Sequence, residues 1–164
     1  MFKPGDKVFV PFYGGGIIEG ITRKQVCGVE YEYIIIAIVI DSIKLFIPKD
    51  KIEGYRIRKI SDVLTMNDAL KIIKEKPISI EKKWTIRYRI NNKKIDDGNI
   101  YSEIEVFRDL KFLNNTSKLS QGENMILEKV EKKVASEVSL VFTIDLKAAY
   151  NILNTLEESN RSIS

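Results

Sequence analysis

The chain of 164 residues contains no histidine, a single cysteine and a single tryptophan. The absence of histidine excludes Ser-His and Cys-His catalysis and removes both the commonest zinc ligand and the usual general base. Cys27 cannot form a disulfide within the chain, and we expect a small packed residue there, with a reactive thiol as the alternative. No GxxxxGK[ST] motif and no strand followed by GxGxxG is found. An enzyme would have to depend on carboxylates, and no pair of them stands out, so we predict no catalytic residue, cofactor, metal or small-molecule substrate.

Long apolar runs are also lacking. The longest one, Ile34–Ile40, is far too short to span a membrane, and the polar, turn-like start Met1–Asp6 does not resemble a secretion signal. We therefore expect a cytoplasmic protein without a membrane partner. The content of 44% hydrophobic and 30% charged residues is ordinary for a folded, soluble protein.

The net charge of +4 is distributed unevenly. Residues 71–94 hold nine basic and two acidic side chains, whereas residues 95–164 carry an excess of acid. Within the basic region, the stretch Lys82–Lys94 sets the only tryptophan, Trp84, among six cations and no acid. An aromatic side chain flanked by Lys and Arg can insert at a base or stack on it while the cations hold phosphates. A solvated, lysine-rich helix face is the alternative, but the tryptophan favours nucleic-acid binding.

The first sixty residues have the pattern of short β-strands. We predict strands over 7–11, 17–21, 31–41 and 43–47 and a short fifth over 54–58, with turns at Gly14–Gly16, Gln25–Gly28 and Asp41-Ser42. Five short strands without helices are typical of a small barrel of Tudor or SH3 type. Such barrels usually bind partners, and an edge strand can accept a partner strand. A barrel that merely packs on the rest of the chain is the alternative.

From Ser61 the apolar period changes from two to 3.6, which predicts an α+β protein with one domain over 1–60 and an all-α helical bundle over 61–164. Ser61 or Asp62 caps a helix that runs to about Lys74, and a second helix covers the basic stretch. Asp97-Gly98-Asn99 forms a turn before a helix with the apolar stripe Ile100, Ile104, Phe107 and Leu110. A capping box at Ser120 and Glu123 opens a long helix that contains Met125, Ile126, Val130 and Val134. Thr143 or Asp145 starts a fifth helix through Ala149, Ile152, Leu153 and Leu156, followed by a frayed tail over Ser159–Ser164.

The helical period also orients the basic stretch. At about 100° per residue, Trp84, Arg87, Tyr88 and Asn91 share one side of the helix, and Ile86 and Ile90 lie on the other. We expect the two isoleucines to face the core. Trp84 is then expected to be exposed.

Several segments together resemble the CarD/CdnL family of bacterial transcription regulators. The resemblance extends from Phe2 to about Leu156, and the N-terminal part is similar to the RNA-polymerase-interacting domain of the transcription-repair coupling factor. The segments that carry it are Gly5-Asp6-Lys7-Val8, Pro11 with Gly14, Ile47-Pro48 to Gly54-Tyr55-Arg56, Trp84-Thr85-Ile86-Arg87-Tyr88, Lys94 with Asp97-Gly98-Asn99, Glu105-Val106-Phe107-Arg108-Asp109-Leu110 and Leu119-Ser120-Gln121-Gly122-Glu123. The coupling factor itself carries ATPase motor motifs, and none is found here.

The resemblance implies a Tudor-like barrel that binds the β subunit of RNA polymerase. It further implies a helical domain set against promoter DNA at the upstream edge of the melted bubble, where it stabilises the open complex largely without base-specific reading. By the same resemblance, Trp84 is expected to act as a wedge in the minor groove. The implied DNA-binding residues are Lys83, Trp84, Arg87, Tyr88, Arg89, Lys93 and Lys94. The implied polymerase-binding residues are Lys24, Tyr33, Phe46 and Pro48.

Three positions bear on how closely the chain follows the family pattern. Phe46 and Asn124 stand where some members have a basic residue, whereas Lys24 keeps the charge. Phe46 leaves open which residues contact polymerase. Asn124 implies one phosphate contact fewer than in the family members that have lysine there. The alternative function is a protein-protein adaptor on RNA polymerase with little or no direct DNA binding.

Overall fold

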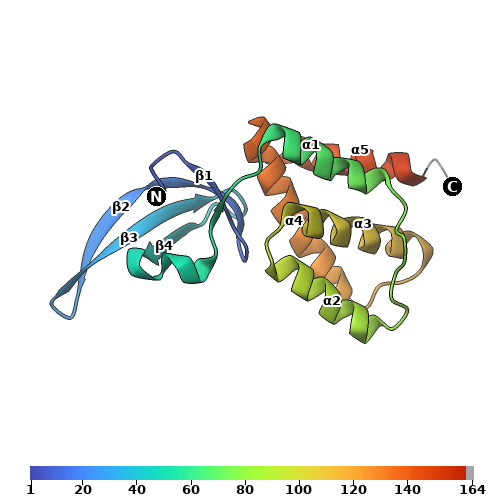
Figure 1. Ribbon diagram of the computed structural model, residues 1–164, viewed down its shortest axis with the longest axis horizontal. Helices are drawn as coiled ribbons and strands as arrows, with labels where there is room; N and C mark the ends of the chain where they lie inside the picture. Colours follow the sequence, from blue (N-terminus) through green and yellow to red (C-terminus); the bar gives the residue numbers. More distant parts are fainter. Residues whose placement is uncertain (162–164) are drawn as a thin grey trace.

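A computed structural model describes residues 1–161 as an antiparallel sheet followed by a group of helices, which confirms the predicted α+β class (Figure 1). The sheet has five strands in the order β4-β3-β2-β1-β5, so that β4 and β5 stand at its two ends. The strands are β1 (Lys7–Val10), β2 (Gly14–Val26), β3 (Val29–Ile38), β4 (Lys44–Pro48) and β5 (Arg58–Lys59), and a 3-10 helix, η1 (Lys49–Tyr55), lies between the last two. The predicted fifth strand over 54–58 is therefore correct only for Arg58: Gly54 and Tyr55 belong to η1, and residues 56 and 57 lie between the two elements.

The long hairpin of β2 and β3 turns at Cys27 and Gly28. Val26 pairs with Val29, and both turn residues have positive φ, 52° and 78°, as a two-residue hairpin turn requires. Cys27 is exposed. The expectation that this cysteine is packed is wrong, because the tip of a hairpin projects beyond the face of the sheet that is buried.

The inner face of the sheet forms an aliphatic core of its own. Alternate residues of β3 point into it, since side chains of a strand alternate between the two faces. The fully or largely buried members are Val8, Val10, Ile18, Ile34, Ile36, Ile38, Ile40 and Ile47.

The helical part contains five α-helices within residues 1–161, as predicted. They are α1 (Val63–Lys71), α2 (Trp84–Asp96), α3 (Ile100–Thr116), α4 (Gln121–Phe142) and α5 (Leu146–Arg161), with a 3-10 turn, η2 (Ile72–Lys74), after α1. Asp62 caps α1 by accepting a hydrogen bond of 2.7 Å from the Thr65 N–H. Ser120 and Glu123 form the predicted capping box of α4.

A separate core holds these helices together. The predicted stripe of α3 is buried in it, as are Ile126, Val130 and Val134 of α4, whereas Met125 is exposed. Helix α5 continues to Arg161, so the predicted fraying from Ser159 is wrong up to that residue, and residues 162–164 lie outside the described part. None of the helices in residues 1–161 is both long enough and apolar enough to cross a membrane.

The sheet packs directly against α4. The Gly15 N–H donates a hydrogen bond of 2.8 Å to the Ser136 hydroxyl, and the Lys7 ammonium donates one of 2.7 Å to the Leu140 carbonyl. A Cβ at Gly15 would lie 2.8 Å from the Leu140 side chain and 3.0 Å from the Ser136 carbonyl oxygen. The turn predicted at Gly14–Gly16 is wrong, because the three glycines begin β2 and pair with β1, and the turn lies at residues 11–13. Gly14 has a positive φ of +88°, and Gly15 is needed because the helix approaches the strand so closely.

A buried ion pair lies near this contact. The Lys133 ammonium is 2.6 Å from the Glu103 carboxylate, and both side chains are almost completely buried. Burial raises the pKa of Glu103 to about 7, against the opposing attraction of Lys133. Burial also lowers the pKa of Lys133, so the pair is less strongly ionised than an exposed one would be.

Candidate nucleic-acid and protein interfaces

Trp84 is the first residue of α2, and its side chain is 54% exposed, as the sequence predicts. The preceding residue, Lys83, is the N-cap, and its N–H donates a hydrogen bond of 3.0 Å to the Glu81 carboxylate. The first turn contains no acidic residue. The positive end of the helix dipole and its unpaired N–H groups therefore coincide with the exposed side chains of Lys82 and Lys83, which favours the approach of a phosphate.

The orientation predicted for the rest of α2 is wrong. Ile86 and Ile90 are 36% and 44% exposed, whereas Asn91, on the side assigned to solvent, is 5% exposed. The inward side is thus the one that carries Arg87 and Asn91, whereas Tyr88, which is 37% exposed, lies at its edge. Trp84 shares that side but is exposed, because it lies at the start of the helix, one turn before the residues that contact α4.

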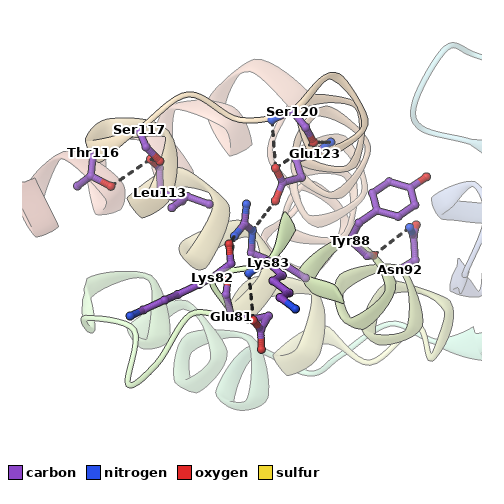
Figure 2. Close-up of polar contacts among 11 residues, drawn as sticks. Glu81, Lys82, Lys83, Tyr88, Asn92, Leu113, Thr116, Ser117, Ser120 and Glu123 are labelled. Atoms are coloured by element: carbon purple, nitrogen blue, oxygen red, sulfur yellow. Dashed lines mark hydrogen bonds and ion pairs between the residues drawn. The ribbon is translucent and has the colours of Figure 1, made fainter. Parts of the chain in front are cut away.

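Arg87 forms a buried ion pair with Glu123 of α4. Its Nε donates to one carboxylate oxygen of Glu123, and an Nη donates a hydrogen bond of 2.6 Å to the Glu81 carbonyl. The other oxygen accepts hydrogen bonds from the Ser120 N–H and hydroxyl at 3.1 Å and 2.9 Å, as the dashed lines in Figure 2 show. Burial by itself raises the pKa of Glu123, but Arg87 and Ser120 outweigh it and hold the pKa below its ordinary value.

Tyr88 covers the first turn of α4. A Cβ at Gly122 would lie 3.0 Å from the Tyr88 ring. The ring therefore packs closely on α4 at the position of this glycine, where a larger residue would be in the way. Figure 2 shows Tyr88 on α2 beside Asn92, whose amide donates a hydrogen bond of 3.1 Å to the Tyr88 carbonyl. The structure therefore gives Arg87 and Tyr88 contacts that hold α2 in place.

The other cations of α2 remain directed to solvent. Lys83, Arg89 and Lys93 are exposed and form no ion pair within residues 1–161. Arg89 and Lys93 are four residues apart and therefore neighbours on the helix surface. Lys94 is different, because its ammonium lies 2.9 Å from the Glu105 carboxylate.

The four residues assigned to polymerase lie together on the outward face of the sheet. Tyr33 pairs with Pro48 and Ile35 pairs with Phe46 across β3 and β4, and directly paired residues point to the same face. The Lys24 ammonium, from β2, lies 4.2 Å from the centroid of the Phe46 ring. This is a cation-π contact across β3. Phe46, which departs from the basic residue of some family members, thus positions a positive charge contributed by Lys24.

No local pattern marks the partner of Arg87. Glu123 is recognisable from sequence as a capping-box residue, but the guanidinium that reaches it comes from 36 residues away. In the described residues, no three His, Cys, Asp or Glu side chains are grouped so that they could hold a metal ion. Two features of the described surface correspond to the sequence predictions: a basic helix end with an exposed tryptophan, and an aromatic face of the sheet.

The fold is an α+β arrangement of one sheet and a group of helices, and the comparisons with known proteins place the chain in a family. Residues 2–61 match the family model described as "CarD-like/TRCF RID domain", and residues 68–154 match the model "CarD, C-terminal domain". The chain is 30% identical over 141 residues to the protein of Bacillus subtilis (strain 168) named "Putative transcription factor YdeB", covering 86% of this chain and 92% of that protein. The chain belongs to the CarD family. The family is one of transcription-related proteins that interact with RNA polymerase, rather than of enzymes.

Proposed function

We propose that this protein binds the β subunit of RNA polymerase and stabilises the open promoter complex by placing Trp84 as a wedge at the upstream edge of the melted bubble. The observation that carries the proposal is the exposure of Trp84 at the basic N-terminus of α2. The buried ion pair of Arg87 and Glu123 attaches this helix to α4. A wedge must be held rigidly, since unstacking a base step costs a few kcal/mol that a mobile side chain would not recover.

The cations of α2 divide into two roles in this proposal. Lys83, Arg89 and Lys93 contact DNA phosphates, because they are exposed and unpaired within residues 1–161. Lys94 contributes less, since Glu105 already balances its charge. Arg87 and Tyr88 support the wedge by holding α2 on α4 rather than by contacting phosphates. Phosphate and wedge contacts carry little base information, so the effect is largely independent of sequence.

The sheet supplies the targeting. Lys24, Tyr33, Phe46 and Pro48 form the polymerase-binding face, in which the exposed ring of Phe46 is the natural anchor because aromatic residues dominate binding energy at interfaces. Once polymerase holds the sheet near the promoter, the DNA contact becomes intramolecular. A weak affinity for free DNA is then sufficient for occupancy of the bubble edge.

The test is the lifetime of the open complex on a promoter after challenge with a competitor. Trp84→Ala should shorten the lifetime about tenfold or more, since an aromatic-base contact is worth about 1–3 kcal/mol. Its affinity for polymerase should not change. Phe112→Ala, which removes another exposed aromatic side chain on α3, is the matched control and should behave like the natural protein. An unchanged lifetime in Trp84→Ala would refute the wedge.

A second candidate function is an adaptor on polymerase that does not contact DNA. The exposed isoleucines Ile86 and Ile90 favour it, because an apolar pair on the outer side of α2 suits a protein surface better than a phosphate backbone. Footprinting of the promoter with polymerase, in the presence and absence of this protein, separates the two. Added protection upstream of the bubble supports the DNA contact, and its absence supports the adaptor.

A further inference from the structure

Arg58 of β5 joins the sheet to two separate parts of the helical region. Its two Nη atoms lie 2.7 Å and 2.8 Å from the two carboxylate oxygens of Glu137 on α4. Its Nε donates a hydrogen bond of 2.7 Å to the carbonyl of Gly98. Its guanidinium also lies 4.3 Å from the centroid of the Phe9 ring in β1. This one side chain of β5 therefore contacts β1, α4 and the segment that follows α2.

The Gly98 contact fixes the C-terminal end of α2. Gly98 comes two residues after the last residue of the helix and has φ of +65°. A Cβ at this position would lie 2.9 Å from Cγ of Pro11, so the turn also packs against the sheet. The end of α2 opposite Trp84 is thus attached to the sheet by a hydrogen bond from Arg58 and by contact with Pro11.

The other end of α2 is attached to α4, and α4 is attached to the sheet. Arg87 and Glu123 make the first connection, and the hydrogen bond from Gly15 to Ser136 makes part of the second. The sheet, α2 and α4 therefore form a closed ring of contacts. Figure 1 shows α2 on the side of the helical group away from α1 and α5, with α4 running from α5 towards α2. Arg58 is the residue that takes part in two of the three connections.

Glu137 is fully buried, and its carboxylate is surrounded by donors. Besides Arg58, the N–H and the hydroxyl of Ser61 donate hydrogen bonds of 2.8 Å and 2.9 Å to it. Ser61 lies in the segment between β5 and α1. The Glu137 carboxylate of α4 thus binds both β5 and the segment that connects it to α1. These bonds limit the movement of the helices relative to the sheet.

We infer that Arg58 is a positioning residue that fixes Trp84 at a set place relative to the polymerase-binding face. The inference rests on the proposed function, in which polymerase holds the sheet and the wedge must then meet the bubble edge. The gain from tethering depends on how narrowly the second contact is positioned. If the ring opened at Arg58, α2 would sample more positions, and the local concentration of the wedge at the bubble would fall.

The variant that tests this is Arg58→Met combined with Glu137→Gln. The pair of changes removes the ion pair and the bond to Gly98 without leaving a buried charge unpaired, and the new side-chain amide on α4 keeps an acceptor for Ser61. Breaking only one side of a buried pair is strongly destabilising, whereas replacing both is often tolerated. Arg58→Lys is the milder second variant, since it keeps the charge but cannot bridge both carboxylate oxygens. Lys71→Gln, which removes an exposed ion pair with Asp68 on α1, is the control.

The direct measurement is the distance distribution between two spin labels. The native Cys27 at the tip of the β2–β3 hairpin provides one label position, and Thr85→Cys, an exposed residue beside Trp84, provides the other. We expect a narrow distribution in the otherwise natural full-length protein and in Lys71→Gln. The double variant should give a clearly broader distribution, with Arg58→Lys between them.

The functional measurements use the unlabelled proteins. The double variant should keep the affinity of the natural protein for polymerase and for free duplex DNA, yet shorten the open-complex lifetime about tenfold, because only the tethering gain is lost. A distance distribution as narrow as that of the natural protein would overturn the inference, whatever the lifetime. A broader distribution with an unchanged lifetime would overturn it as well. If the natural protein does not prolong the lifetime at all, the proposed function fails, and the distance measurement still decides whether Arg58 fixes α2.

Discussion

Arg87 of α2 and Glu123 of α4 are joined by an ion pair in which the carboxylate is fully buried and the arginine side chain is 12% exposed. The same carboxylate completes the capping box of α4. The start of α4 and the helix that carries Trp84 thus share one charged group. We therefore expect Glu123 to matter for stability far more than a capping residue usually does, since a cap is worth about 1 kcal/mol.

The first prediction concerns this residue. Glu123→Ala should lower the free energy of unfolding by about 3–5 kcal/mol, because it leaves a largely buried guanidinium without its partner and removes the acceptor of the Ser120 N–H in the capping box. Urea denaturation followed by circular dichroism measures the change. Glu128→Ala, an exposed position on the same helix, should stay within about 0.5 kcal/mol of the natural protein. A loss below about 1 kcal/mol in Glu123→Ala would show that the pair contributes no more than an exposed one.

The second prediction concerns the turn after α2. Gly98→Ala should destabilise the protein by about 1–3 kcal/mol, because a Cβ there meets Pro11 and the residue has positive φ. Gly54→Ala is the matched control, since nothing lies within 4 Å of its Cβ position and its φ is not positive. Thermal unfolding of both variants tests the difference. Equal stability of Gly98→Ala and the natural protein would contradict the packing of this turn on the sheet.

The third prediction is a dependence of stability on pH. The pKa of Glu103 is about 7 in the folded protein, against 4.5 for an unperturbed glutamate. The folded state therefore binds the proton of the Glu103 carboxyl more tightly than the unfolded state does. The stabilisation that comes from this protonation is fully present below about pH 4.5 and is lost as the pH rises to about 7. The unfolding free energy should consequently contain a component that falls across this window.

Glu103→Gln isolates that component, because the amide stays neutral at every pH. Its unfolding free energy, measured in urea at several pH values, should decline less between pH 4.5 and 7 than that of the natural protein. Glu128→Gln, an exposed position, should leave the profile unchanged. Lys133 and Arg58 favour the charged form of Glu103, and Glu137 opposes it, so parallel profiles for Glu103→Gln and the natural protein would mean that the two cations keep Glu103 ionised throughout.

The fourth prediction concerns salt and depends on the proposed DNA contact. Lys93→Gln should reduce the slope of log K for duplex DNA against log salt by about 1, as expected for the loss of one phosphate contact. Lys94→Gln should change it less, because Glu105 already pairs with Lys94. Lys147→Gln, an exposed position on α5, should have no effect. Identical slopes for Lys93→Gln and Lys147→Gln would count against α2 as the phosphate-binding element.

Local sequence patterns were sufficient for much of the fold. The concentration of β-branched and aromatic residues predicted the strand that contains Ile34–Ile38, and the apolar stripe from Ile100 to Leu110 predicted α3. Capping chemistry placed the start of α1 at Ser61 or Asp62, of which Asp62 is the cap, and the start of α4 at Ser120. These features are set by interactions within a few residues, so they can be recognised without knowing the neighbours in space.

The orientation of α2 could not be recognised in this way. Ile86 and Ile90 are apolar and therefore look like core residues, yet the helix turns Arg87 and Asn91 inward. The reason is Glu123, whose buried carboxylate offers Arg87 a partner that no apolar side chain could replace. A distant charge thus outweighed the local hydrophobic pattern, which in α2 is weak because cations surround each isoleucine.

The sequence by itself determined the α+β class, the five helices with their main caps and the concentration of positive charge around Trp84. These depend on periodicity, capping and composition, all of which are local. Only the tertiary structure decided that Arg87 and Tyr88 hold α2 on α4, that Lys24 lies over Phe46, and that Arg58 connects the sheet to both α4 and the turn after α2. Each of these contacts joins residues far apart in the chain, and their pairing follows from the packing of whole elements rather than from any pattern along the sequence.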